Sequence, residues 1–253
     1  MPALDYARLA SLYDAMVTER ADLDFFLDAA RQADGPVAEF MAGTGRLAVP
    51  LAEAGVDITC VDSSREMLQI LDGKLVAKGL RARTVCEDVT RVNIGSQFSL
   101  VFIAFHSFEE LVADADQRAC LDTVRRHLRA DGRFICTLHD IPSRLATVGP
   151  GKPGRWQFLD PRSGRQVTLS LETEYDSQTD IMQGSESFSY VGESVPFLHV
   201  PLRFRLVRAD AFRQLAEDAR FVVESVRAGF TGAEYREGQS PTADWTLRLR
   251  RTV

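Results

Sequence analysis

The most informative segment of this 253-residue chain is VAEFMAGTGRLA, residues 37–48. It opens with Val37–Met41, a short apolar run interrupted by Glu39, which is typical of a buried parallel strand. Ala42–Gly45 is a turn of small residues, and an apolar helical pattern begins at Leu47. The stretch therefore predicts a strand that leads through a glycine-rich turn into a helix. Backbone in such a turn can approach a ligand closely, because glycine has no Cβ, and the helix start offers unpaired N–H groups.

Two cofactors compete for this turn. Gly43–Ala48 fits G-x-G-x-x-A, the fingerprint of dinucleotide-binding proteins. Glu39–Gly45 also fits E-x-x-x-G-x-G, the motif with which class I methyltransferases bind S-adenosylmethionine. The glycines do not distinguish the two, and a turn that binds nothing would need the same geometry. Asp62, an acid at the end of the next expected strand, favours a bound nucleotide-like ligand over an empty turn.

The composition is that of an ordinary globular protein, with 45% hydrophobic and 26% charged residues. A net charge of −6 argues against bulk binding to nucleic acid or to an anionic membrane. The four cysteines form no C-x-x-C pair, so we expect no metal site, no disulfide framework and a reduced, cytoplasmic setting. The first residues do not resemble a signal peptide, and no apolar run of about 18 residues is present to span a bilayer.

Strand and helix patterns alternate between Val37 and Asp140, which predicts a parallel sheet with helices on both faces. The expected strands cover residues 37–41, 56–61, 82–86, 98–105 and 133–138. The expected helices cover residues 4–16, 22–31, 47–54, 65–78, 114–129 and 209–219. Because ligands lie beyond the carboxyl ends of such strands, the residues at these ends should gather around one crevice. They are Glu39, Gly43, Asp62, Asp88, His106 and His139.

The pattern changes after Pro142. Residues 155–206 are expected to form an inserted antiparallel meander, with β-rich stretches at 167–174, 181–191 and 202–207. Residues 221–227 and 245–250 are expected to be two closing strands, which add an antiparallel edge to the parallel sheet.

Four motifs, taken together, resemble the class I S-adenosylmethionine-dependent methyltransferases. They are EFMAGTGR (39–46), CVDSS (60–64), CEDVT (86–90) and HLRADGRF (127–134). The insertion resembles the strand-rich cover of members that act on small molecules. The resemblance implies a Rossmann-like α/β fold, with a seven-stranded, mostly parallel sheet, an antiparallel closing strand and a small antiparallel β insertion. It divides the chain into a helical cap (1–34), a cofactor-binding core (35–142 and 207–253) and an inserted cover over the acceptor site (143–206).

The resemblance also implies roles for single residues. Gly43, Thr44 and Gly45 would pass close to the methionine and ribose parts of the cofactor, Asp62 would accept both ribose hydroxyls, and Asp88 would bind the adenine amine. The expected cofactor-binding set is Tyr13, Glu39, Ala42, Gly43, Thr44, Gly45, Asp62, Ser63, Met67, Asp88, Val89 and Phe105. One departure is Met41, where the family often has glycine; its side chain would either crowd the cofactor or point into the sheet.

Residues after the fourth expected strand are candidates for chemistry. His106 is expected to face the reacting centre, as a general base or a positioning donor. A polar strand-end residue without a chemical role would look the same in the sequence. Phe108, Glu109, His139 and Arg203 are the expected substrate contacts.

We therefore expect methyl transfer from S-adenosylmethionine to a small-molecule amine or hydroxyl by in-line displacement, with S-adenosylhomocysteine as product. The alternatives are an NAD(P)-dependent oxidoreductase, for which no Y-x-x-x-K pair is found, and a non-catalytic cofactor-binding protein. A nucleic-acid substrate is disfavoured, because the chain lacks a basic, aromatic-rich face and an N/D-P-P-Y/F motif. A monomer or a homodimer is expected.

Overall fold

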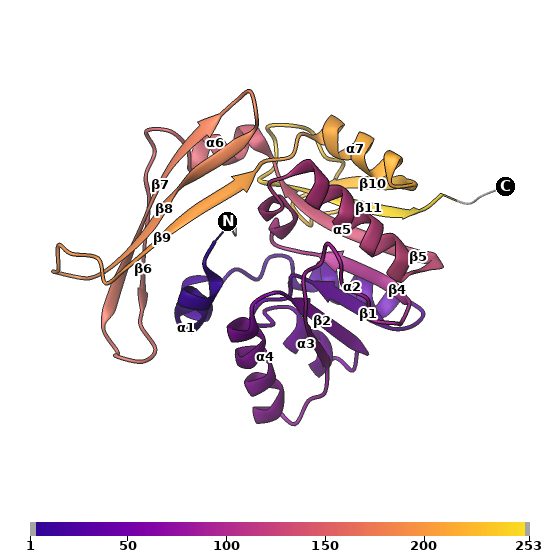
Figure 1. Ribbon diagram of the computed structural model, residues 1–253, viewed down its shortest axis with the longest axis horizontal. Helices are drawn as coiled ribbons and strands as arrows, with labels where there is room; N and C mark the ends of the chain where they lie inside the picture. The colour runs from indigo at the N-terminus through magenta and orange to yellow at the C-terminus, as the bar shows by residue number, and fades with distance from the viewer. Residues whose placement is uncertain (1–3, 251–253) are drawn as a thin grey trace.

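The computed structural model describes residues 4–250, which form two β-sheets (Figure 1). Seven strands make the main sheet, in the order β10-β11-β5-β4-β1-β2-β3, and four make a second sheet, in the order β6-β7-β8-β9. In the main sheet only β11 runs antiparallel to its neighbours. The predicted fold class is confirmed. Residues 1–3 and 251–253, which the predicted segments 1–34 and 207–253 include, lie outside the described residues.

The main sheet reverses its strand order beside β1. Its strands are β1 (Val37–Phe40), β2 (Ile58–Asp62), β3 (Arg83–Cys86), β4 (Phe98–Ile103), β5 (Leu128–His139), β10 (Phe221–Ala228) and β11 (Thr242–Leu249). Strand β1 lies between β2 and β4, with Val37 opposite both Ile58 and Leu100. The chain leaves β1 towards β2 and β3 and returns to β4 on its other side. The carboxyl ends of β1 and β4 therefore border the crevice in which such sheets bind ligands.

Helices cover both faces of the main sheet. They are α2 (Leu23–Gln32), α3 (Ala48–Glu53) and α4 (Arg65–Ala77) on one face, and α5 (Asp114–His127) and α7 (Ala209–Asp218) on the other. Successive residues of β4 alternate between the two buried clusters: Leu100 and Phe102 pack with α2–α4, and Val101 and Ile103 pack with α5 and α7. The alternation follows from the two-residue period of a strand, and it explains why β4 is almost wholly apolar.

The second sheet stands at one end of the molecule (Figure 1). Its antiparallel strands are β6 (Gly154–Leu159), β7 (Gln166–Asp176), β8 (Ile181–Tyr190) and β9 (Leu198–Arg205). Helix α1 (Tyr6–Met16) lies between this sheet and α4. Its buried Leu9 and Leu12 join a cluster with Val167, Phe188 and Val200 of the second sheet. Helix α1 therefore depends on the second sheet for its apolar contacts.

Strand β4 is shorter than expected. It ends at Ile103 instead of residue 105, because Phe105 and His106 have φ angles of 54° and 64°, outside the range of a strand. A short 3₁₀ helix, η1 (Ser107–Glu110), follows at once. This bend turns the polar residues after β4 away from the strand direction.

Three further elements differ from the expectation. Strand β5 begins at Leu128, directly after α5, so the helix expected over 114–129 ends at His127 and Gly132 lies within a strand. Helix α6 (Ile141–Thr147) was not expected; the Asp140 side chain caps it by accepting a bond from the Ser143 N–H at 3.0 Å. Strand β6 adds a fourth strand to the three expected in the meander.

Residues 4–250 contain neither a membrane-spanning helix nor a cluster of metal-binding side chains. No helix there is long and apolar enough to cross a membrane. In the same residues no group of three or more His, Cys, Asp or Glu side chains could hold a metal ion. All four cysteines are free thiols.

Candidate functional site

The turn after β1 is built from left-handed backbone conformations. Met41, Gly43 and Gly45 have φ angles of 61°, 56° and 80°. A Cβ added to Gly45 would lie 2.3 Å from Cδ1 of Leu71, whereas a Cβ on Gly43 would meet nothing within 4 Å. Gly45 thus allows the turn to pack against α4, and Gly43 leaves open space beside the backbone.

Asp62, at the end of β2, holds this turn in place. Its Oδ2 accepts a bond from the Gly43 N–H at 2.7 Å, and its Oδ1 accepts one from the Ser64 N–H at 2.8 Å. Burial raises the pKa of Asp62 above its usual value, although these backbone bonds oppose the shift. An ionised carboxylate offers about four acceptor positions, so each oxygen can still accept a further hydrogen bond.

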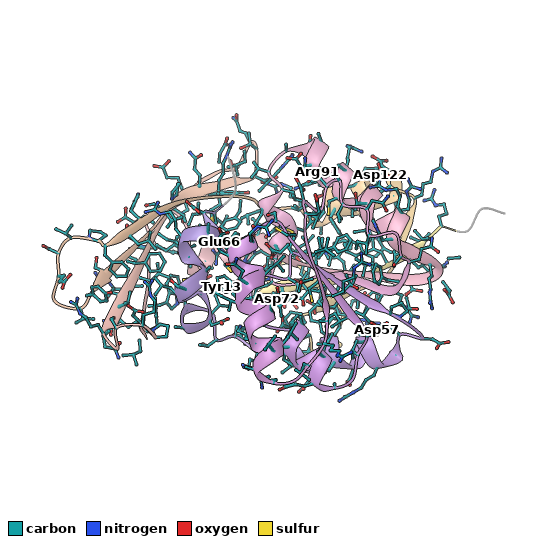
Figure 2. The ribbon with its side chains drawn as sticks, turned by 60° about the horizontal axis from the view of Figure 1, so that its bottom comes forward. Tyr13, Asp57, Glu66, Asp72, Arg91 and Asp122 are labelled. Atoms are coloured by element: carbon teal, nitrogen blue, oxygen red, sulfur yellow. The ribbon has the colours of Figure 1, made fainter. Side chains whose placement is uncertain are left out.

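A cavity of about 790 Å³ lies in front of the turn. We call it the turn cavity, and its lining includes Leu4, Tyr6, Tyr13, Met41, Gly43, Asp62, Ser63, Glu66, Met67, Asp88, Val89, Glu110 and Arg203. It thus brings together the carboxyl ends of β1, β2 and β3 and one side of α1. Figure 2 shows two of its lining residues, Tyr13 of α1 and Glu66 of α4, on the same part of the molecule.

A second cavity, of about 810 Å³, lies beside the first and extends to the second sheet. We call it the cover cavity, and its lining includes Leu4, Tyr6, Tyr13, Phe105, His106, Glu110, His139, Arg144, Trp156, Glu186, Phe204 and the loop at 238–242. Four residues, Leu4, Tyr6, Tyr13 and Glu110, line both cavities. The two cavities therefore meet beside α1 and η1.

The boundary between the cavities is polar and aromatic. The Tyr6 hydroxyl donates a hydrogen bond to Oε1 of Glu110 at 2.6 Å. The rings of Tyr6 and Tyr13 meet edge to face, with centroids 6.1 Å apart. Burial raises the pKa of Glu110 to about 8, so its carboxyl is mostly protonated at neutral pH. A group that reaches from one cavity into the other would pass these side chains.

Two histidines stack at the cover cavity. The rings of His106 and His139 lie 3.7 Å apart at an interplanar angle of 17°, and Nδ1 of His139 is hydrogen-bonded to Oε2 of Glu109 at 2.5 Å. Burial lowers the pKa of both histidines well below the usual value and raises the pKa of Glu109 to about 7. Nε2 of His106 is buried and has no hydrogen-bond partner among the described residues. His106 is thus a neutral imidazole with an unused nitrogen.

Helix α1 is tied to the glycine turn through polar contacts. The Thr44 hydroxyl donates a bond to Oδ1 of Asp14 at 2.6 Å, and the Lys74 ammonium donates one to the Thr44 carbonyl at 2.9 Å. Lys74 also forms an ion pair with Asp14, with the charged atoms 2.6 Å apart. These contacts join α1, the turn and α4, so the wall of the turn cavity is held from three sides.

Behind the turn lies a buried carboxyl. Glu39 is 4% exposed, its Oε2 has no hydrogen-bond partner in the described part of the chain, and burial raises the pKa of Glu39 to about 8. Nearby, Arg46 donates two hydrogen bonds to Asp22, at 2.5 and 2.6 Å, and its guanidinium stands 4.8 Å from the centre of the Phe105 ring. Glu39 therefore has an unused oxygen directly behind the glycine turn.

The structure distributes the predicted site residues over three environments. Those that line the turn cavity are Tyr13, Gly43, Asp62, Ser63, Met67, Asp88, Val89 and Arg203. Those that line the cover cavity are Tyr13, Phe105, His106 and His139. The remaining ones, Glu39, Ala42, Thr44, Gly45, Phe108 and Glu109, line neither cavity.

Two expected substrate contacts are buried away from both cavities. Phe108 is 0% exposed and packs edge to face on Phe212, so it belongs to the core. Glu109 is also 0% exposed, and its two oxygens are bonded to His139 and to the Val207 N–H. Neither side chain lines the turn cavity or the cover cavity, and Glu109 contacts the cover-cavity residue His139. Both side chains are packed inside the protein because η1 turns inward after β4.

Several residues that line the cavities were not expected. They are Tyr6, Glu110, Arg144, Trp156 and Glu186. Tyr6 was detectable, since it lies two helical turns before Tyr13 on the same face of α1. The others carried no local signal, because they come from η1, α6, β6 and β8, which become neighbours only in the folded chain.

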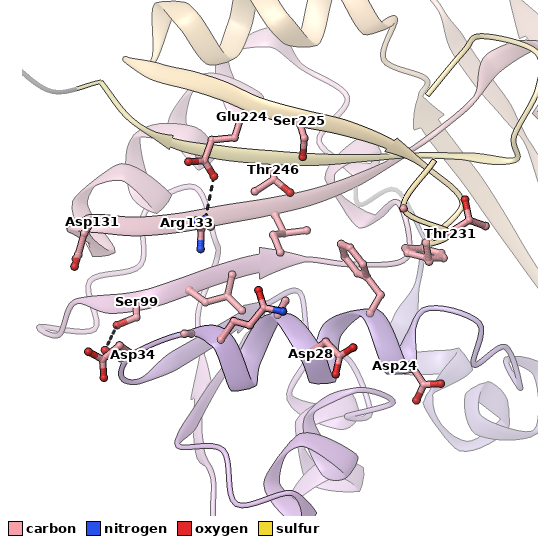
Figure 3. Close-up of a pocket in the computed structure, with 18 residues that line it drawn as sticks. Asp24, Asp28, Asp34, Ser99, Asp131, Arg133, Glu224, Ser225, Thr231 and Thr246 are labelled. Carbon is pink, nitrogen blue, oxygen red and sulfur yellow. Dashed lines mark hydrogen bonds and ion pairs between the residues drawn. The ribbon is translucent and has the colours of Figure 1, made fainter. Parts of the chain in front are cut away.

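A further groove, of about 760 Å³, runs between α2 and the nearby strands (Figure 3). Its labelled residues include Asp24, Asp28, Arg133 and Glu224, and an ion pair joins Arg133 to Glu224 at 2.9 Å. None of the predicted site residues lines this groove. The polar chemistry described above is concentrated in the other two cavities.

Comparison with known proteins points to one kind of domain. Residues 37–132 match the model of a family described as a methyltransferase domain. The chain is also 23% identical over 233 residues to YqeM of Bacillus subtilis (strain 168), itself provisionally named a methyltransferase. That match covers 90% of this chain and 91% of YqeM.

Solved structures show the same fold over nearly the whole chain. The CcbJ methyltransferase of Streptomyces caelestis aligns with a TM-score of 0.82 at 21% identity, covering 97% of this chain and 98% of that one. The glycopeptide N-methyltransferase MtfA, solved with S-adenosyl-L-methionine, aligns with a TM-score of 0.61 at 21% identity, covering 90% and 93%. The second sheet thus lies within the aligned length.

Proposed function

Since residues 37–132 form a methyltransferase domain within the class I methyltransferase fold, we propose that the chain transfers a methyl group from S-adenosylmethionine to a small-molecule acceptor. The acceptor would offer an amine or a hydroxyl. The observation that carries the proposal is the pair of cavities that meet at Tyr13 and Glu110. The turn cavity has the polar groups that a nucleoside needs, and the cover cavity offers separate space for an acceptor.

The turn cavity fits the cofactor. Asp62 keeps a free acceptor position on each oxygen, which suits the two hydroxyls of a ribose. Asp88 and Met67 line the same cavity and would contact the adenine. The unpartnered oxygen of Glu39 lies behind the turn, where it can bind the cofactor's amino group through water. The open space at Gly43 would admit the cofactor's tail.

The residues of this chain would act mainly by aligning the acceptor with the methyl group and the sulfur of the cofactor. When bound, S-adenosylmethionine supplies a methyl group activated by a positively charged sulfur. Tyr13 and Tyr6 would exclude water from the passage between the cavities and hold the acceptor in line. Good alignment of this kind can lower a barrier by roughly 7–11 kcal/mol.

His106 is our candidate for receiving the acceptor's proton. Its Nε2 is unpartnered, and the lowered pKa keeps the ring neutral at pH 7, so it can accept a proton. His139 stacks on it and is oriented by Glu109. A neutral amine could also attack first and lose its proton afterwards, so His106 would matter most for a hydroxyl acceptor.

We further propose the division of labour that the sequence predicts. Residues 1–34 would cap the cofactor, 35–142 and 207–253 would bind it, and 143–206 would cover the acceptor. The contacts of α1 with the second sheet and with Thr44 support this division.

Titration calorimetry with S-adenosylhomocysteine and with NADH tests the proposal. Native protein is compared with Asp62→Ala, with Asp62→Asn and with Asp72→Asn, which removes an exposed carboxylate of α4 that lines neither cavity. We expect S-adenosylhomocysteine alone to bind, about 10-fold or more weaker in both Asp62 variants and unchanged in the Asp72 variant. Binding of NADH alone would instead assign an oxidoreductase. Tight S-adenosylhomocysteine binding without methyl transfer to any acceptor of a broad panel would assign a cofactor-binding protein without turnover.

A further inference from the structure

Two oppositely charged side chains line the cover cavity without a partner. Arg144 comes from α6, and Glu186 comes from β8 of the second sheet. Neither side chain lines the turn cavity. Both side chains therefore lie in the part of the cover cavity that is not shared with the turn cavity.

The Arg144 guanidinium is partly buried and unsatisfied. Its Nε is buried without a hydrogen-bond partner, and among residues 4–250 it forms no ion pair within 4.0 Å. Burial of this kind is costly for a permanent cation unless an anion compensates it. A guanidinium in such a position is suited to binding a planar oxyanion through two parallel hydrogen bonds.

The carboxyl groups near Arg144 do not compensate its charge fully. Glu109 and Glu186 are the two that act on Arg144 electrostatically. Burial raises the pKa of each to about 7, so each is only partly ionised at neutral pH. Glu109 is already bonded to His139 and Val207. The two neighbouring histidines, His106 and His139, are neutral at this pH and do not change the charge around Arg144.

Glu186 provides a hydrogen-bond acceptor beside the donor groups of Arg144. Its Oε2 is buried and has no hydrogen-bond partner in the described residues. A direct ion pair with Arg144 would satisfy both groups, yet the structure has none within 4.0 Å. The pair therefore presents a donor group and an acceptor group to the same cavity.

The wall of the cover cavity also includes aromatic side chains, on which an organic molecule can pack. Trp156, Phe204 and Phe105 contribute aromatic surface to the cover cavity. Trp156 is 46% exposed although it is a large aromatic residue. Aromatic surface together with convergent polar groups is typical of a small-molecule site.

We propose that the methyl acceptor carries an oxyanion, a carboxylate or a phosphate, that Arg144 binds, and a neighbouring hydrogen-bond donor that Glu186 binds. The acceptor's nucleophilic end then points towards Tyr13 and Glu110, where the two cavities meet. This inference rests on the proposed function, because it names the acceptor class of that site. It makes Arg144 a specificity-determining residue of the reaction.

Trp156 gives a direct optical test that needs no turnover. The chain has two tryptophans, and Trp245 is only 1% exposed, so a ligand in the cover cavity changes the emission of Trp156. The probes are two matched pairs: L-phenylalanine with L-phenylalaninamide, and phosphoethanolamine with ethanolamine. Both members of each pair carry an amine, and only one of them carries an oxyanion, a carboxylate in the first pair and a phosphate in the second.

Native protein is compared with Arg144→Gln and with Arg155→Gln. Arg155 is an exposed arginine that lines neither cavity and precedes Trp156 on β6, so its side chain points to the opposite face. We expect at least one oxyanion-bearing probe to bind native protein about 10-fold or more tighter than its partner that lacks the oxyanion. That preference should vanish in Arg144→Gln and persist in Arg155→Gln. Equal binding within both pairs, no saturable binding of any probe, or a preference that survives Arg144→Gln would each overturn the proposal.

A parallel titration separates this proposal from the proposed function. S-adenosylhomocysteine should bind Arg144→Gln within about twofold of native protein, which also shows that the variant is folded. Should S-adenosylhomocysteine fail to bind native protein, the methyltransferase proposal fails, whereas the anion preference is still measured by Trp156. Should S-adenosylhomocysteine bind while no anion preference appears, only the acceptor assignment fails.

Discussion

Met41 has a backbone conformation that favours glycine. Its φ of 61° places a residue with a Cβ in the left-handed region, which costs roughly 1–2 kcal/mol. The side chain lines the turn cavity and also packs against the main core. The position is therefore a source of local strain beside the candidate cofactor site.

We expect Met41→Gly to be more stable than Met41→Ala by about 1 kcal/mol. Both variants lose the same side-chain contacts, so the comparison isolates the cost of a Cβ at this φ. Urea unfolding of the two variants measures the difference in the free energy of unfolding. An alanine variant as stable as the glycine variant would show that the backbone relaxes.

Glu39 should make stability depend on pH. Burial raises the pKa of its carboxyl from 4.5 to about 8 in the folded chain. Its contribution to stability is therefore complete below about pH 4.5 and is lost as the pH rises through about 8. Glutamine resembles the protonated acid in shape and cannot ionise.

We accordingly expect the free energy of unfolding to fall between pH 5 and pH 9 by about 1.4 kcal/mol or more further in native protein than in Glu39→Gln. Chemical unfolding at several pH values measures this. Glu87→Gln, on an exposed carboxylate, is the matched control and should follow native protein. Parallel curves for native protein and Glu39→Gln would mean that Glu39 is hydrated in the folded state.

The two glycines of the turn after β1 have different roles: Gly45 allows packing against α4, and Gly43 leaves space for a ligand. We expect Gly45→Ala to cost about 2–4 kcal/mol, since the added Cβ meets Leu71 and the φ is positive. Gly43→Ala should cost only about 1 kcal/mol, because its Cβ meets open space, yet it should weaken S-adenosylhomocysteine binding. Unfolding curves and calorimetry on the two variants measure the two effects. Equal stability losses would contradict the packing role of Gly45.

The helices and strands that could be predicted from the sequence are those marked by nearby residues. The β1–turn–α3 unit and the antiparallel closing strand were predictable, because apolar runs and glycines mark them. The end of β4 was not, since Phe105 and His106 adopt positive φ angles without a glycine to signal it. Glu109 was expected beside the substrate because it follows β4 in the sequence. The same bend instead places its side chain in the core. Arg144 and Glu186 were unpredictable for another reason: α6 and β8 approach each other only through the meander.

Helix α1 joins the two sheets of the protein. It packs Leu9 and Leu12 on the second sheet, and it reaches the glycine turn through Asp14. A ligand in the turn cavity should therefore stabilise α1 as well as the glycine turn. Binding at about 100 times the dissociation constant adds about 2.7 kcal/mol to the stability of the parts that open together.

We expect amide hydrogen exchange of α1 to slow when S-adenosylhomocysteine is bound, together with that of the turn. Exchange mass spectrometry with and without the ligand measures this. Asp14→Asn, which removes the ion pair with Lys74, should reduce the protection of α1 more than that of the turn. Protection confined to residues around the turn would contradict the coupling.

The position of α1 also constrains the order in which the chain can fold. This helix is synthesised before the sheets it contacts, and its apolar partners, from Val148 to Leu202, follow more than a hundred residues later. Leu9 and Leu12 must therefore remain uncovered through most of synthesis, while the central strands can already pair. Contacts between such distant parts of a chain form late and slowly. We therefore expect α1 to dock late, although it precedes the other described helices in the chain, and its docking to complete the wall shared by the two cavities.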